Sequence, residues 1–158
     1  MPMHESHGLA GRLSIELRDP SGRLVDARRV NNLITDAGRT LLARLFTGTA
    51  QSPDLQIAVG RSGTRAEIAD TKLGDFVVAA PATVPSVAPG DYEGQQRIVA
   101  RVVATLPPTG NADPQPLQEA GILVGVTGAE PVLYNRVTFP VVNRAGNLEM
   151  TLSWEVIF

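Results

Sequence analysis

The stretch Asn147–Phe158, "NLEMTLSWEVIF", alternates apolar and polar residues with a period of two. Its apolar positions are Leu148, Met150, Leu152, Trp154, Val156 and Phe158, and Glu149, Thr151, Ser153 and Glu155 stand between them. Successive side chains of a β-strand point to opposite faces of the sheet, so one face of this stretch is apolar. The pattern predicts a half-buried strand that closes the core, with Trp154 inside it.

Similar patterns occur upstream. "RLSIELRD" at 12–19 places Leu13, Ile15 and Leu17 on one face, and "LVDARRV" at 24–30 returns after the turn "DPSGR". Residues 12–30 are therefore predicted to form a hairpin. Further strands are predicted at 55–59, 96–106, 118–126 and 132–142. Together they predict two antiparallel sheets of about six to eight strands.

One segment has helical spacing instead. In "NNLITDAGRTLLARLFTG" at 31–48, Thr35 or Asp36 can begin a helix and Gly48 can end it. The apolar residues Ala37, Leu41, Leu42, Leu45 and Phe46 recur on one side of that helix. We therefore predict a mainly β (α+β) fold, an antiparallel β-sandwich with one principal amphipathic helix near residues 36–47. The helix is expected to plug an open face or end of the sandwich, and aspartate at Leu41 or Trp154 is expected to unfold the domain.

The domain organisation follows from length and composition. The chain of 158 residues suits one domain, predicted at 12–158 after a flexible N-terminal segment at 1–11. Residues 77–95 contain "AAPATVPSVAPGD", whose prolines and small residues break long elements. This Pro/Ala-rich segment is predicted to be a surface loop or an extended arm that docks on a neighbouring subunit.

Composition excludes several classes of protein. A net charge of −2 gives no electrostatic footprint for nucleic acid, and the absence of cysteine removes thiolate nucleophiles and Cys-based metal sites. Aromatic residues make up only 4% of the chain, which argues against a stacking cleft for carbohydrate or single-stranded nucleic acid. No stretch approaches the ~20 apolar residues of a membrane span. We expect a soluble cytoplasmic protein.

A search for chemistry is negative. His4 and His7 form an H-x-x-H without a third ligand nearby, and "GRSGT" at 60–64 lacks the G-K-[ST] of a phosphate loop. The acidic residues Asp70, Asp75, Asp91, Glu93, Asp113 and Glu119 do not have EF-hand spacing. A pair of carboxylates could still meet in space, which spacing alone does not reveal. We predict no catalytic, cofactor-binding or metal residues, and no enzyme activity.

The order of short motifs carries a resemblance. "NLITDAG" opens the helix, "IAVGRSGT" ends a strand in a turn, "EAG" precedes a strand, and "WEVIF" closes the chain. This order resembles small structural proteins of bacteriophage tails and phage-derived contractile injection systems, of the tail-fibre or tail-collar type. The residues that carry the resemblance are Asn32, Thr35, Gly38, Leu41, Leu42, Gly60, Gly63, Thr64, Glu119, Ala120, Gly121, Arg136, Phe139, Trp154, Glu155 and Phe158. The segment at 77–95 departs from the family pattern, in which a more strand-like connection is expected.

The resemblance implies a virion or particle component without catalytic residues. It would be a structural subunit of a tail fibre, collar or baseplate, assembling with itself and with other tail proteins through symmetric contacts. The alternatives are a receptor- or glycan-binding tip domain of such a particle, which would meet a host-surface receptor, or a capsid-decorating protein.

The predicted subunit contacts lie in two places. Val84, Pro85, Val87 and Pro89 belong to the 77–95 segment, which is more apolar than a free surface loop usually is. Arg39 and Arg44 of the helix are left for the surface or a neighbour. We expect the segment to contact another subunit, as an extended arm or an added edge strand, and expect deletion of residues 80–90 to leave the monomer folded.

Overall fold

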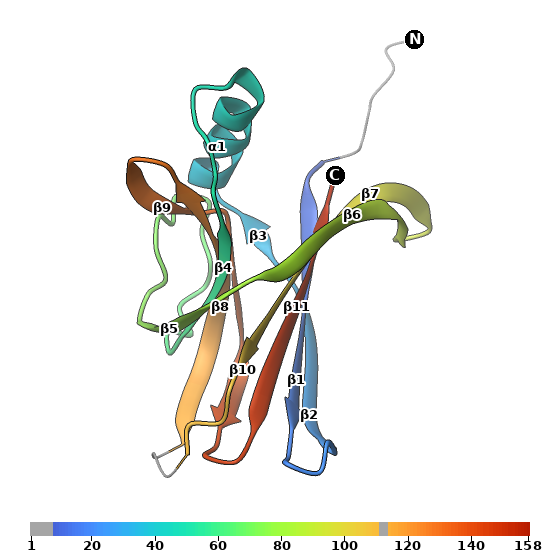
Figure 1. Ribbon diagram of the computed structural model, residues 1–158, viewed down its shortest axis with the longest axis vertical. Coiled ribbons are helices and arrows are strands. Elements are labelled where there is room, and N and C mark those ends of the chain that lie inside the picture. Colours follow the sequence, from blue (N-terminus) through green and yellow to red (C-terminus); the bar gives the residue numbers. More distant parts are fainter. Residues whose placement is uncertain (1–7, 111–113) are drawn as a thin grey trace.

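The computed structural model describes residues 8–110 and 114–158, which form two antiparallel sheets (Figure 1). The first sheet has five strands, in the spatial order β2 (Leu24–Asn31), β1 (Ala10–Arg18), β11 (Glu149–Ile157), β7 (Gln95–Leu106) and β6 (Thr83–Tyr92). The closing strand β11 is central, because Trp154 pairs with Leu13 of β1 on one side and with Val102 of β7 on the other. The mainly β fold is confirmed.

The second sheet has six strands. Its order is β3 (Leu33–Ile34), β10 (Asn135–Arg144), β8 (Gln115–Val126), β4 (Leu55–Gly60) and β5 (Phe76–Pro81), with β9 (Ala129–Leu133) also paired to β8. The described residues thus form eleven strands, more than the six to eight predicted. The predicted strand at 132–142 is in fact two strands, interrupted at Tyr134. Short strands such as β3 carry too few residues to show a period of two.

The core lies between the facing surfaces of the two sheets. Leu13, Ile15 and Leu17 are at most 2% exposed, and Trp154 is fully buried, as predicted. The indole N–H of Trp154 donates to Oδ1 of Asn32, at 2.6 Å, so the polar end of the ring has a partner. Strand β1 begins two residues before the predicted boundary at residue 12, while residues 1–7, including His4 and His7, lie outside the described residues.

Helix α1 (Asp36–Thr47) has the predicted bounds. The Thr35 hydroxyl accepts from the backbone N–H of Gly38, at 2.9 Å, and Gly48 ends the helix with φ of 76°. Only glycine adopts such a positive φ at little cost, so Gly48 is a C-terminal cap. At twelve residues, α1 is neither long nor apolar enough to cross a membrane. No helix within the described residues is long and apolar enough to do so.

The helix stands at one end of the sandwich beside β9 (Figure 1). Gly38 packs so closely on the backbone of Tyr134 that a Cβ there would overlap its carbonyl oxygen. Leu41 is buried, but Phe46 is 92% exposed, so the predicted apolar side of the helix is only partly covered. The prediction was wrong for Phe46 because the helix meets the end of the sandwich through Gly38 and Leu41, with Leu42 and Leu45 partly buried beside them, and Phe46 lies beyond this contact.

The prediction of a loop at residues 77–95 was wrong. The segment forms β5 and β6, and the chain passes from one sheet to the other at Ala82, between them. Both strands are sheet edges, and Ala80 is only 6% exposed. Deleting residues 80–90 would remove this crossover and most of β6, so the expectation of an unaffected monomer no longer holds. Alternating prolines and small residues obscured the strands, because proline is tolerated at sheet edges.

Candidate interaction surface

An apolar cleft opens at the end of the sandwich that carries α1. Its volume is about 520 Å³. Leu42 and Leu45 of the helix line one side of the cleft. The six-stranded sheet contributes Leu55, Pro81, Ile122 and Val124, and the five-stranded sheet contributes Pro85, Ala100, Val102 and Val156. The rest of the lining comes from the crossover residue Ala82, from Tyr134 and Phe158, and from residues 52–54. The helix therefore does not plug the end of the sandwich completely.

The β6–β7 hairpin forms the opposite wall of this end (Figure 1). A two-residue turn at Glu93 and Gly94 joins the strands, with φ of 51° and 78°. Positive φ at both turn residues matches the right-handed twist of a hairpin, and glycine makes the second position easy to adopt. Beyond the cleft the hairpin continues without cover from the six-stranded sheet, so Val87 is 72% exposed and Ile98 is 47% exposed.

The outer edge of β6 is poorly suited to adding another strand. Tyr92 and Gln95 flank the two-residue turn and form a hydrogen-bonded pair, after which bonded and non-bonded pairs alternate. Pro89 therefore falls among the residues whose backbone points away from β7, and it has no N–H to offer. Pro85 in the same strand lacks one as well. Missing donors protect a sheet edge from pairing, so this surface offers apolar side chains rather than a free ladder.

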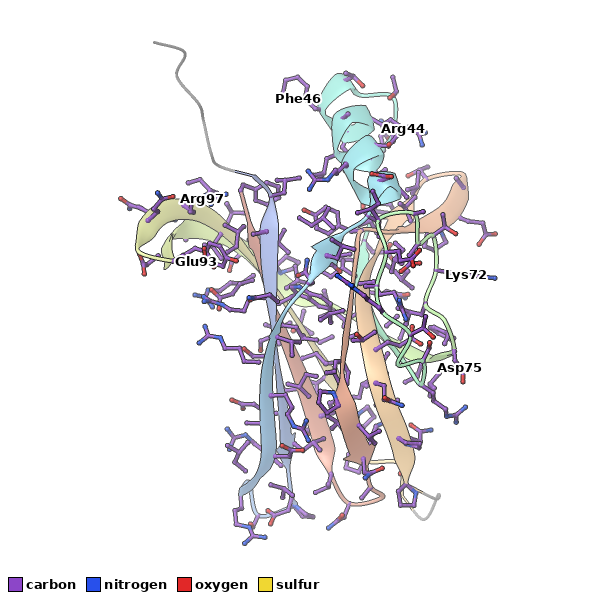
Figure 2. All side chains as sticks on the ribbon, turned by 180° about the vertical axis from the view of Figure 1, so that it is seen from behind. Arg44, Phe46, Lys72, Asp75, Glu93 and Arg97 are labelled. Carbon is purple, nitrogen blue, oxygen red and sulfur yellow. The ribbon has the colours of Figure 1, made fainter. Side chains whose placement is uncertain are left out.

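The predicted contact residues whose side chains the structure describes are exposed, but they do not form one site. Pro85, Val87 and Pro89 are exposed on β6, and the side chain of Val84 lies outside the described residues. Arg39 and Arg44 are both exposed on α1. Figure 2 shows Arg44 and Phe46 on opposite sides of the helix, with Phe46 toward the side of the β6–β7 hairpin. Arg44 instead lines a shallow hollow with Gly128 and the residues around the β8–β9 turn.

A second cluster, which the sequence did not predict, surrounds Glu119. This fully buried carboxylate accepts from the backbone N–H groups of Ser62 and Gly74, both at 2.7 Å, and of Asp75, at 2.9 Å. It also accepts from Nε of Arg136, at 3.2 Å. The cluster ties the 61–75 loop to the six-stranded sheet, and four donors occupy the carboxylate of Glu119.

Arg136 extends this cluster across the loop. It is 3% exposed, and its Nη1 lies 3.0 Å from a carboxylate oxygen of Asp70. Gly60 belongs to the same place, because a Cβ there would overlap the backbone oxygen of Asp75. The buried Leu73 then packs from the loop against Ala58 of the sheet. The Glu119 carboxylate is bonded to three N–H groups of the loop, and Arg136 bonds to Asp70 of the same loop although its Nη2 has no partner among the described residues, so the pair holds the loop on the sheet.

The comparisons add no relative. No family model, no curated protein and no solved structure matches this chain. In the described residues, no group of three or more acidic or histidine side chains could hold a metal ion, while His4, His7 and Asp113 lie outside them.

Several of the residues that carry the resemblance have structural roles in this fold. Thr35 begins the helix, and its hydroxyl also donates to the Leu133 carbonyl, at 2.6 Å. Glu119 and Arg136 form the loop anchor described above. Phe158 departs from the prediction that it lies in the core, because it is 41% exposed and lines the cleft. These contacts could be found only after residues distant in sequence had been placed.

Tyr134 lines the cleft and carries an unusual hydroxyl. Burial raises the pKa of Tyr134 to about 12, although the charge of Arg39 acts in the opposite direction. The residue is 4% exposed, and its hydroxyl has no hydrogen-bond partner among the described residues. An unpaired buried hydroxyl destabilises the fold, and its ionised form would do so more.

Tyr134→Phe is expected to change stability by less than about 1 kcal/mol at neutral pH, because it removes an unpaired group. Because the pKa of Tyr134 is higher in the folded protein than in the unfolded chain, it contributes to the free energy of unfolding. This contribution is complete below the unfolded pKa of 10 and is lost as pH rises toward 12. The wild type should therefore lose roughly 2 kcal/mol between pH 10 and 12 that the variant keeps. Urea unfolding of both proteins across this range measures the difference. If the free energy of unfolding fell equally with pH in the wild type and in Tyr134→Phe, the raised pKa of Tyr134 would be contradicted.

Proposed function

We propose that the protein is a non-enzymatic structural subunit of a phage tail or phage-tail-like particle, and that it associates with copies of itself. The observation that supports self-association is the apolar surface at one end of the sandwich. Phe46 and Val87, on either side of the cleft, are the two most exposed large apolar side chains of the described residues. Apolar surface that is concentrated beside an apolar cleft is typical of a protein interface. The type of particle is supported by the motif resemblance.

The cleft favours this function over a glycan-binding tip. Carbohydrate sites combine aromatic side chains with several convergent polar groups. Tyr134 and Phe158 are the aromatic residues that line the cleft, Ser52 and Asp54 are its polar ones, and the remainder is mainly aliphatic or proline. Binding to a defined sugar on a glycan array, lost on mutation of the cleft, would favour the alternative instead.

Sedimentation velocity of the full chain over a wide range of concentrations tests self-association. We expect a defined species larger than the monomer. A monomer at every concentration would contradict the proposal. Immunogold labelling of particles from the bacterium that encodes the protein tests the second part, and unlabelled particles would contradict the assignment to a tail while leaving self-association intact.

A further inference from the structure

The end of the sandwich carries two largely exposed strips, one on each side of the cleft, and their chemistry is complementary. The helix strip consists of Arg39, Leu42 and Phe46, spaced three and four residues apart on one side of α1. The hairpin strip consists of Val87, Pro89 and Asp91, alternate residues of β6, together with Ile98, which pairs with Pro89. Alternate residues of a strand share a face, so the hairpin strip is continuous.

Leu42 is half-buried at the cleft, but the other side chains of the two strips are exposed in their own molecule. Phe46 is 92% exposed and Val87 is 72% exposed. Arg39 and Asp91 are also exposed, and neither forms an ion pair within residues 8–110 and 114–158. Each strip is therefore apolar over most of its length and ends in a single unpaired charge, positive on the helix and negative on the hairpin.

The two strips also match in length. Arg39 and Phe46 are seven residues apart, which is ~10 Å along an α-helix. Val87 and Asp91 are four residues apart, which is ~13 Å along a strand. With Phe46 placed on Val87, the long side chain of Arg39 comes within reach of Asp91. In this one register, the apolar side chains of the two strips contact each other and the opposite charges of Arg39 and Asp91 are paired.

We propose that α1 of one copy packs on the β6–β7 hairpin of a second copy, with Phe46 on Val87 and Arg39 paired with Asp91. Phe46 then sits at the mouth of the partner's cleft, which Pro85 lines. A second copy is the occupant that satisfies both strips with one kind of contact, because every copy supplies one helix strip and one hairpin strip. Pro85 and Pro89 have no backbone N–H to donate at the outward edge of β6, so the contact is made by side chains. This inference rests on the proposed self-association.

Charge exchange in the full chain tests the register. Arg39→Glu and Asp91→Arg each place like charges together and should weaken self-association at least about tenfold. The double variant, Arg39→Glu with Asp91→Arg, restores opposite charges and should recover to within about threefold of the wild type. Phe46→Ser should weaken association at least about tenfold, because it removes an aromatic anchor.

Arg44→Glu is the matched control, since Arg44 is exposed on the same helix but on the side away from Phe46. It should leave the dissociation constant unchanged. Sedimentation velocity gives that constant, and thermal melting confirms that each variant is folded. A wild type that stays monomeric would overturn the proposed function as well. If the wild type associates and the Arg39, Asp91 and Phe46 variants associate with the same dissociation constant, this contact alone is overturned. A double variant that associates no more tightly than the single variants would overturn it as well.

Discussion

Glu119→Ala is expected to lower the free energy of unfolding by about 3–5 kcal/mol, because it leaves Nε of the buried Arg136 guanidinium without its acceptor and keeps only the half-buried Asp70 as a carboxylate partner. Arg136 is 3% exposed, so water does not replace the lost partner. The N–H groups of Ser62, Gly74 and Asp75 lose their acceptor at the same time. Urea unfolding of wild type and variant, followed by circular dichroism, measures the loss.

Glu155→Ala provides the comparison. Glu155 also contacts arginine, with Arg12 at 3.0 Å, but it lies on the outer face of the five-stranded sheet and its side chain is 15% exposed. Burial would raise the pKa of Glu155, yet the hydrogen bond and charge of Arg12 and the charges of Arg101 and Arg29 lower it. Water can solvate what remains, so we expect a loss of about 1 kcal/mol or less. Equal losses for Glu119→Ala and Glu155→Ala would contradict the anchoring role.

Proteolysis separates the loop from the rest of the fold. The 61–75 loop contains Arg61, Arg65 and Lys72, at which trypsin can cleave. Under native conditions, Glu119→Ala should speed cleavage in this loop more than elsewhere, because its three anchored N–H groups are released. Arg136→Ala should have a smaller effect, since those N–H donors remain bound to Glu119. A loop that stays as resistant as in the wild type would show that other contacts hold it.

Trp154→Asp is expected to abolish folding. Removing a large buried aromatic side chain costs about 3–5 kcal/mol by itself. The aspartate would also bury an unpaired charge at the centre of the sandwich, between β1 and β7. Domains are stable by only about 5–15 kcal/mol, so the two costs together exceed the margin. Loss of the cooperative thermal transition is the measurement.

Trp154→Phe is the conservative counterpart. It keeps an aromatic ring in the core and removes the hydrogen bond to Asn32, so we expect a smaller loss of about 1–3 kcal/mol. Asn32→Ala should cost a similar amount, because the indole N–H is then left buried without its acceptor. If Trp154→Asp melted at the same temperature as the wild type, the central position of Trp154 in the core would be disproved.

The sequence by itself determined the elements whose signals are local. Alternation along β1 and β11 predicted which side chains face the core, because a half-buried strand must place every second residue inside. Thr35 or Asp36 predicted the start of α1 and Gly48 its end, since capping needs a side-chain acceptor at one end and a positive φ at the other. Trp154 was assigned to the core for the same reason as its neighbours in the strand. These features depend on residues within a few positions of each other.

Tertiary structure alone decided which surfaces meet. Phe46 and Leu41 carry the same apolar signal, yet only Leu41 is buried, because the helix touches the sandwich along one side. The segment from Phe76 to Tyr92 became two edge strands because other strands of both sheets were present to pair with it. Glu119 found its partners in a loop more than forty residues away. Such contacts depend on how distant strands pair and where a helix docks, and local periodicity contains neither.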